Sequence, residues 1–195
     1  MRSQRKVIVV TGGPGGGKTT ALDLFQRELK TAVKIVPEAA TMLFGHGLDR
    51  EARNDHTRIL QRSIYRMQIS LEEIFRDFYT GRLLICDRGT LDGLAYWPDN
   101  EESYFQSLDT TFEAEAARYG AVIFFQTAAI HGEDVKSNNP YRTEDSRTAV
   151  SLDEKLQRVW ARHHSFHFIP TELSFVAKIN NGLEAIARVM EQMRD

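Results

Sequence analysis

The stretch TGGPGGGKTT, residues 11–20, decides the fold. It fits the pattern G-x-x-x-x-G-K-[ST], with Gly12, Gly17, Lys18 and Thr19 in the fixed places. A short β-branched run, KVIVV, precedes the pattern, and TTALDLFQREL, with apolar residues at helical spacing, follows it. The order of strand, glycine loop and helix is typical of a loop that holds nucleotide phosphates.

The loop predicts how a nucleotide is bound. Glycines let backbone N–H groups approach phosphates closely, and the following helix presents its positive end to them. Lys18 is expected to reach the β- and γ-phosphates, and the Thr19 hydroxyl to ligate Mg²⁺. The expected nucleotide-binding residues are Gly13, Pro14, Gly15, Gly16, Gly17, Lys18, Thr19 and Thr20.

The nucleotide base is less well defined by the sequence. A guanine-selective loop of the Asn-Lys-x-Asp kind would need that tetrapeptide, and the chain contains none. The stretch IPTELSFVAKINNG instead offers Phe175 or Lys178 beside a base. The sequence therefore favours ATP and leaves GTP open.

Strand-like and helical segments alternate along the chain. The strand-like runs are 6–11, 32–37, 82–87, 121–127 and 166–170, and the helical patterns are 19–30, 38–46, 55–79, 101–118, 151–164 and 182–194. This alternation predicts one α/β domain over residues 1–195, with helices on both faces of a parallel sheet. Such a sheet binds its ligand beyond the carboxyl ends of its strands.

Charged residues follow two of these strands. Asp87 leaves the run RLLIC and is expected to hold Mg²⁺ together with Thr19. Arg88 is a candidate phosphate or acceptor clamp, or half of a surface salt bridge. Glu38 is a candidate catalytic acid or base, or a first-turn acid that complements a helix dipole. Asp92 fits either a metal or acceptor ligand or a turn cap.

Residues 131–150 have almost no apolar periodicity. They include Arg142 and Arg147, and they follow a predicted strand. The segment fits a lid that closes over phosphates, and its composition alone fits a solvated loop. We expect the lid, with Arg142 and Arg147 as the arginines that it carries.

The predicted helix at 55–79 carries two further patterns. Arg58, Arg62 and Arg66 form one stripe, which is more typical of a solvated face paired with acids than of a binding site. Gln61 and Gln68 share another face, and a carboxamide there can read a base edge. That role is the less favoured one for the two glutamines.

Composition limits the partners and the compartment. The net charge is −2, so nucleic acid and anionic membrane are not expected partners. No apolar run of about 18 residues occurs, so no transmembrane segment is expected. The single cysteine, Cys86, lies in an apolar run and fits a small buried residue. With no signal-peptide pattern at the N-terminus, a cytoplasmic protein is expected.

Four motifs together resemble a known family. They are the phosphate loop, VPEAAT, LLICDRGTLDGLAYWP, and NPYRTED ahead of SLDEKLQRVW. The combination resembles the compact P-loop ATPase domain, often labelled AAA, of NadR-type ribosylnicotinamide kinases and TRPL-translocation-defect proteins. It is more distantly similar to deoxynucleoside and thymidylate kinases, and the similarity runs from about residue 6 to 185.

The resemblance implies a three-layer P-loop NTPase fold with a five-stranded parallel sheet of the nucleoside/nucleotide-kinase type. It also implies an acceptor pocket opposite the γ-phosphate, with Glu38 at the position that receives the acceptor proton. Asp87 and Arg88 match the acid–arginine pair, and Arg142 matches the lid arginine, with Arg147 as a second candidate.

Two functions remain open. The first is an ATP-dependent phosphotransferase, a kinase or ATPase in the broad sense, acting on a small hydroxyl acceptor such as a nucleoside. The second is an ATP- or GTP-binding switch with weak hydrolysis, in which a protein or phosphoinositide partner reads the lid.

Overall fold

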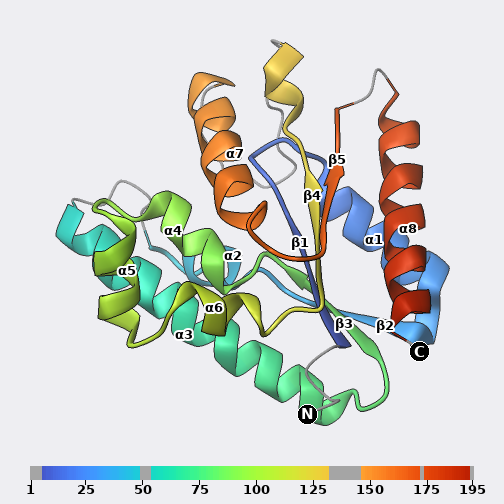
Figure 1. Ribbon diagram of the computed structural model, residues 1–195, viewed down its shortest axis with the longest axis horizontal. Coiled ribbons are helices and arrows are strands. Elements are labelled where there is room, and N and C mark those ends of the chain that lie inside the picture. The colour runs from blue at the N-terminus through green and yellow to red at the C-terminus, as the bar shows by residue number, and fades with distance from the viewer. Residues whose placement is uncertain (1–5, 49–53, 132–145, 172–173, 194–195) are drawn as a thin grey trace.

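The chain forms a five-stranded sheet with helices on both faces (Figure 1). The computed structural model describes residues 6–48, 54–131, 146–171 and 174–193. All neighbouring strands run parallel, in the order β2-β3-β1-β4-β5. The strands are β1 (Val7–Thr11), β2 (Val33–Val36), β3 (Leu83–Asp87), β4 (Ala121–Phe125) and β5 (Phe166–Ile169).

Two groups of helices enclose the sheet. One face packs against α1 (Lys18–Leu29) and α8 (Phe175–Gln192). The other face lies under α3 (Asn54–Phe78), α4 (Gly93–Tyr96), α5 (Glu101–Leu108), α6 (Phe112–Ala116) and α7 (Ser146–Trp160). The short helix α2 (Ala39–Phe44) follows β2 and contacts α3.

The strands are apolar on both sides because both faces are covered. In β1, Ile8 and Val10 face the cluster built with α1 and α8, whereas Val7 and Val9 face the opposite cluster. Cys86 is fully buried in that second cluster, as its apolar surroundings predict. Trp160 is also fully buried there, in a packing position.

The strand register places the candidate site. Val10 of β1 lies opposite Asp87 of β3, and Thr11 lies opposite Phe124 of β4. The loops that leave β1, β3 and β4 therefore emerge side by side at one edge of the sheet. The phosphate loop, which leaves the central strand β1, lies between the other two.

The predicted sheet is confirmed, and three helices differ from their predicted bounds. The predicted helix at 101–118 is two helices, because Asp109 adopts a left-handed conformation (φ 54°) and Thr111 caps a new helix. Helix α8 begins seven residues early, where the Ser174 side chain accepts a hydrogen bond from the Ala177 amide. Helix α7 begins at Ser146, inside the predicted lid.

None of the described helices combines the length and apolar character needed to cross a membrane.

Candidate nucleotide-binding site

The glycine loop is held tightly between β1 and α1. Gly12 has φ +133°, and a Cβ there would lie 2.0 Å from the carbonyl oxygen of Phe125, so only glycine fits. Gly17, with φ +82°, is the residue before α1. A Cβ on Gly17 would lie 2.6 Å from the Phe175 ring. The loop therefore takes a conformation that other residues would disturb at both ends.

Lys18 lies against this loop. Its side chain is 3% exposed, and Nζ donates a 2.6 Å hydrogen bond to the carbonyl of Gly13. The ammonium group is thus held over the loop whose N–H groups are expected to bind phosphates. Thr19, in the first turn of α1, is exposed. Both residues lie where the motif predicts.

Asp153 also holds the loop, and sequence reasoning missed it. It lies on α7, is 4% exposed, and its Oδ1 accepts hydrogen bonds from the amides of Gly13 (2.6 Å) and Thr127 (3.0 Å). The Thr127 hydroxyl in turn donates to the carbonyl of Pro14 at 2.5 Å. One carboxylate oxygen therefore joins α7, the end of β4 and the phosphate loop.

The surroundings of Asp153 make its carboxyl group a weaker acid. Burial raises the pKa of its carboxyl above the usual range. The hydrogen bonds from Gly13 and Thr127 and the charge of Lys18 act in the opposite direction but do not outweigh burial. Asp153 lies within SLDEKLQRVW, a stretch that carries the family resemblance, but an aspartate within a helical apolar pattern gives no local signal of this contact. Its role depends on a contact across 140 positions of sequence.

A buried ion-pair cluster lies beside the loop, on the side of β2 and β3. Arg88 donates from Nε to Glu38 (2.7 Å) and from a terminal nitrogen to Asp92 (2.8 Å). All three are buried, with exposed fractions of 7%, 9% and 4% respectively. The Thr41 hydroxyl also donates to Glu38, at 2.5 Å. The structure therefore joins Glu38 and Arg88 directly, in an ion pair that is buried and not at the surface.

Arg88 has an unusual backbone and a crowded charge environment. Its φ is +70°, a left-handed conformation that is costly for a residue with a branched or long side chain and that is often found at functional sites. Burial by itself lowers the pKa of Arg88, but its neighbours Tyr96, Glu38 and Asp92 raise it above the usual range. The guanidinium therefore stays charged while buried.

Asp92 acts as a turn cap and hub in this structure. It accepts hydrogen bonds from the Gly89 amide (3.0 Å), the Thr11 hydroxyl (2.6 Å) and the indole of Trp160 (3.0 Å), besides Arg88. Of its two predicted roles, these contacts match the cap of the turn that follows β3. Through Thr11, the last residue of β1, Asp92 joins the Glu38–Arg88 pair to the start of the phosphate loop.

Oxygen donors suited to Mg²⁺ lie at the same edge of the sheet. Asp87 is the last residue of β3, is partly exposed, and lies opposite Val10 in the strand next to the loop. Thr19 presents an exposed hydroxyl in the first turn of α1. Mg²⁺ prefers one or two protein oxygens plus nucleotide phosphates and water, and we expect Asp87 and Thr19 to supply the protein oxygens. The described residues contain no cluster of three or more metal-binding acids, histidines or cysteines.

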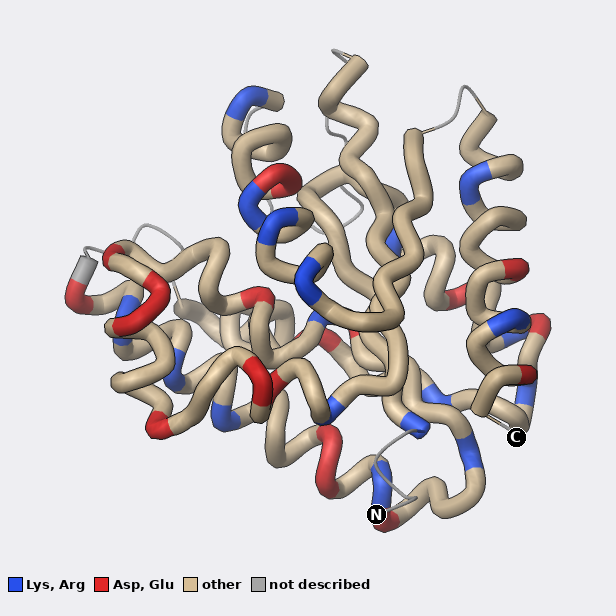
Figure 2. The backbone as a smooth tube through the Cα atoms, viewed as in Figure 1, with Lys and Arg blue, Asp and Glu red and all other residues tan. Residues whose placement is uncertain are grey.

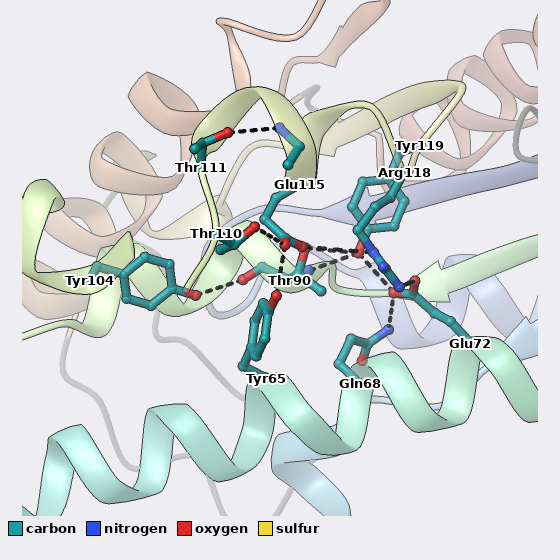
Figure 3. A network of polar contacts seen from close by, with 11 residues as sticks. Tyr65, Gln68, Glu72, Thr90, Tyr104, Thr110, Thr111, Glu115, Arg118 and Tyr119 are labelled. Atoms are coloured by element: carbon teal, nitrogen blue, oxygen red, sulfur yellow. Dashed lines mark hydrogen bonds and ion pairs between the residues drawn. The ribbon is translucent and has the colours of Figure 1, made fainter. Parts of the chain in front are cut away.

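A second polar network supports the turn after β3 (Figure 3). Thr90 donates its amide to the Tyr119 hydroxyl (2.9 Å), which donates to the fully buried carboxylate of Glu72 (2.8 Å). Arg118 pairs with the same carboxylate at 2.6 Å, and Gln68 donates to it at 3.0 Å. This network anchors the turn that carries Asp87 and Arg88 to helix α3.

The two glutamines of α3, Gln61 and Gln68, have different surroundings in the structure. Gln68 is 3% exposed and belongs to the Glu72 network, so its carboxamide has a structural partner. Gln61 is 7% exposed, and its Oε1 lies 3.2 Å from where a Cβ on Gly93 would be. Gln61 thus lies beside Gly93, directly after the turn that bears the Arg88 cluster, whereas Gln68 supports that turn through Glu72.

Phe175 and Lys178, the candidate base contacts, differ in their exposure to solvent. Lys178 is 3% exposed and donates to the carbonyl of Gln126. Phe175 is 48% exposed at the start of α8, with its ring against Gly17. A half-exposed aromatic side chain therefore lies next to the phosphate loop, whereas Lys178 is buried and holds the end of β4.

The arginines of the predicted lid are only partly placed. Arg142 lies outside the described residues. Arg147 is exposed in the first turn of α7.

On α3, Arg58 pairs with Asp55 (2.6 Å) and Asp99 (2.7 Å), which confirms the predicted solvated, acid-paired face for this residue.

The comparisons with known proteins agree with the fold. Two solved structures share the fold: thymidylate kinase from Ehrlichia chaffeensis (TM-score 0.61, 13% identity, 94% of this chain and 97% of that one), and deoxyadenosine kinase from M. mycoides with bound dATP (TM-score 0.54, 14% identity, 95% and 99%). No curated protein sequence matches the chain. A family described as an AAA domain matches residues 7–174, which include the phosphate loop, the Glu38–Arg88 pair and Asp153. The chain belongs to this AAA-domain family of P-loop proteins.

Proposed function

We propose that this protein is an ATP-dependent phosphotransferase that moves the γ-phosphoryl group of ATP to a hydroxyl of a small acceptor. The observation that carries the proposal is the buried Glu38–Arg88 pair, which Asp92 and Thr11 join to the start of the phosphate loop. A carboxylate held beside a phosphate site can take the proton of an attacking hydroxyl. Hydrolysis alone needs no such acceptor side.

Each residue then has a role that the chemistry of phosphoryl transfer requires. The transfer depends on positioning and on neutralising charge. Lys18 would bind the β- and γ-phosphates, and Arg142 would add positive charge from the lid. Thr19 and Asp87 would hold Mg²⁺, which neutralises phosphate charge when bound. Glu38 would orient the acceptor hydroxyl and accept its proton.

A nucleoside-like acceptor is the substrate class that we favour. The motifs that resemble NadR-type ribosylnicotinamide kinases support it, as does the likeness of fold to a thymidylate kinase and a deoxyadenosine kinase. Gln61, next to Gly93, would supply a carboxamide to an acceptor bound beside the Arg88 cluster. Such a group can donate to and accept from the edge of a base or an amide.

The test is product formation from ATP across a panel of nucleosides, ribosylnicotinamide included, against a reaction with water alone. We expect one acceptor class to yield a phosphorylated product well above the rate of hydrolysis. Lys18→Ala should abolish ATP binding and transfer, whereas Lys155→Ala, at an exposed lysine of α7, should change neither. No product from any acceptor, with ATP binding intact, would contradict the proposal.

One observation favours the second candidate function, the nucleotide-binding switch. Glu38 and Arg88 are bound to each other, and Arg88 is bound on its other side by Asp92. A cluster so connected can respond to a γ-phosphate by rearranging rather than by catalysis. ATP binding with slow hydrolysis, no transfer, and nucleotide-dependent binding of a protein or phosphoinositide would support this function.

A further inference from the structure

Helix α7 carries two buried polar side chains on one face. Asp153 and Trp160 are separated by about two helical turns, so they lie on the same side of the helix and about 10 Å apart along its axis. Leu156 lies between them, is fully buried, and forms a small apolar cluster with Ala95 and Phe124. One face of α7 therefore presents two polar groups to the body of the protein, with an apolar contact between them.

The two polar groups bind different parts of the candidate site. Asp153 accepts a hydrogen bond from the amide of Gly13, at the start of the phosphate loop. The indole Nε1–H of Trp160 donates to Oδ2 of Asp92 at 3.0 Å, and Asp92 also accepts from Arg88. Helix α7 therefore joins the phosphate loop to the cluster that holds Arg88.

The indole of Trp160 also packs on the backbone beside Arg88. A Cβ on Gly89 would lie 2.9 Å from the indole ring, so the ring lies directly against the turn after β3. On another side the ring meets Tyr119 edge-on, with 5.7 Å between the ring centroids. The indole is thus fixed by packing, and its N–H is directed at one carboxylate oxygen.

The carboxylate of Asp92 is held at both oxygens. Oδ1 accepts from the Thr11 hydroxyl (2.6 Å) and from Arg88 (2.8 Å). Oδ2 accepts from the Gly89 amide (3.0 Å) and from Trp160 (3.0 Å). A carboxylate has about four sites for donors, so these four bonds together fix its orientation. Without the indole N–H, Oδ2 would keep one donor, and the oxygen that accepts from Arg88 would be less firmly placed.

Arg88 is the group that this arrangement orients. Its Nε donates to Glu38, and one terminal nitrogen donates to Asp92. Its second terminal nitrogen has no hydrogen-bond partner among the residues that the structure describes. Because a guanidinium presents its donors in one rigid plane, the two bonded nitrogens set the direction of the third. The direction of this remaining donor depends on Asp92, and so on Trp160.

We propose that Trp160 is a positioning residue, through which α7 makes the placement of Arg88 depend on whether the phosphate loop is occupied. Phosphates bound by the loop amides displace Gly13, and Asp153 moves with it because the two are hydrogen-bonded. Trp160, on the same face of the same helix, then shifts against Asp92. The nucleotide and acceptor sides are thereby coupled, and such coupling is reciprocal. The inference rests on the proposed function only for nucleotide binding at the loop.

The test follows the indole N–H of Trp160 by NMR in the ¹⁵N-labelled full chain. The chain has two tryptophans, so Trp97→Phe identifies the Trp160 cross peak. A saturating concentration of the non-hydrolysable ATP analogue AMPPNP with Mg²⁺ should shift this peak. The Trp97 peak should shift less, because its indole donates to Ser103 and not to the Arg88 cluster. Calorimetry establishes saturation for each protein.

Three variants locate the coupling. Asp153→Ala cuts the link at the phosphate loop and should lose most of the Trp160 shift, even with the analogue saturating. Glu154→Ala should keep the shift, since Glu154 is exposed. Figure 2 shows the two acids of α7 as one red stretch between basic residues, so this control removes the same charge from the same part of the helix. Thr11→Val removes the direct bond from β1 to Asp92 and should also keep most of the shift.

Transfer assays give a second readout, with the acceptor that the nucleoside panel identifies. Trp160→Phe keeps an aromatic ring and removes the N–H. It should raise the KM for the acceptor about tenfold and change the KM for ATP by less than about twofold, because the lost bond orients the acceptor side only. Equal increases in both KM values would overturn the positioning role.

The outcomes separate this inference from the proposed transfer. A Trp160 peak that stays in place while the analogue is bound would overturn the inference alone, as would an undiminished shift in Asp153→Ala. A shift in a protein that transfers to no acceptor would support the inference and contradict the kinase. A chain that does not bind the analogue would overturn both.

Discussion

The backbone amide of Gly13 donates a 2.6 Å hydrogen bond to the carboxylate of Asp153, which lies 140 positions further along the chain. Gly13 also accepts a hydrogen bond through its carbonyl, from Lys18. One residue at the start of the phosphate loop thus donates to α7 through its amide and accepts from Lys18, the lysine expected to contact phosphates, through its carbonyl. We therefore expect Asp153 to be a positioning residue, which would act on a bound nucleotide through the loop.

Replacing Asp153 tests this role. In Asp153→Ala the buried amides of Gly13 and Thr127 lose their acceptor, which costs about 1–3 kcal/mol for each unsatisfied group. We expect ATP to bind at least about tenfold more weakly and the protein to unfold more easily. Asp153→Asn keeps an acceptor oxygen, so it should restore ATP affinity to within about threefold of the parent.

The control is Glu154→Ala, at the exposed neighbouring position on α7. Calorimetric titration with ATP, well below the unfolding temperature, separates loop positioning from stability. If Asp153→Ala loses stability but binds ATP normally, Asp153 is a structural residue only.

The raised pKa of Asp153 gives a prediction for pH. An acid whose pKa is higher in the folded state stabilises the fold at low pH, and this contribution is lost as the pH rises through the folded pKa. Asp153→Asn cannot titrate. The melting temperature of Asp153→Asn minus that of the parent should therefore increase between about pH 4 and pH 7. A difference that is constant with pH, or that decreases, would contradict the raised pKa.

Phe175 is expected to contact the base of the nucleotide. Its ring is open to solvent next to Gly17, and base–aromatic stacking contributes about 1–3 kcal/mol. Phe175→Ala should therefore weaken ATP binding about five- to a hundredfold and leave inorganic tripolyphosphate binding unchanged. Val176→Ala, at the exposed next residue, is the control. If both ligands weaken equally, the ring acts through the loop and does not stack on a base.

Glu72 is expected to determine the stability of the turn after β3. Its carboxylate is fully buried and accepts from Arg118, Tyr119 and Gln68. Removing one partner of a buried ion pair costs about 3–5 kcal/mol, so Glu72→Ala should lower the free energy of unfolding by that amount. Glu113→Ala, at an exposed acid of α6, should change it by less than about 0.5 kcal/mol. Urea denaturation measures both, and equal losses would contradict the role.

The parts of the fold that local sequence encodes were predictable. Buried parallel strands are short apolar runs, and the glycine loop marks the junction of β1 and α1, so the sheet and the phosphate site follow directly. The residues that end each strand, Glu38, Asp87 and Arg88, could be placed at one edge because parallel strands share that edge. Their location was therefore predictable before their partners were.

The contacts between distant elements were not predictable. Asp153 reaches Gly13 across the whole domain, and Glu72 reaches Tyr119 and Arg118 from another helix. Glu72 belongs to no motif, and the stretch SLDEKLQRVW that contains Asp153 does not indicate its partners, because these are set by how helices pack on the sheet. The break at Asp109 has a similar cause, since a left-handed residue and the following cap interrupt one apolar pattern without a glycine or proline.

Glu38 decides between the two proposed functions. Its carboxylate is 9% exposed and accepts from Arg88 and from the Thr41 hydroxyl. In Glu38→Gln the amide oxygen can still accept from Arg88, and the Thr41 hydroxyl can accept from the new amide nitrogen, so the shape is kept. The variant loses the ability to take a proton and the negative charge beside Arg88, which keeps its second ion pair with Asp92. Transfer should fall about 10²–10⁴-fold while ATP affinity stays nearly unchanged, because a positioned base contributes that much.

Thr41→Val is the matched control for Glu38→Gln. It removes one hydrogen bond of about 0.5–1.5 kcal/mol but leaves the carboxylate and its pairing with Arg88. Transfer should therefore fall by no more than about tenfold. Single-turnover assays with saturating ATP measure the chemical step in both variants. If Glu38→Gln transfers as fast as the parent protein, Glu38 is not the base, and the Glu38–Arg88 pair is better explained as the part of a nucleotide switch that rearranges around the γ-phosphate.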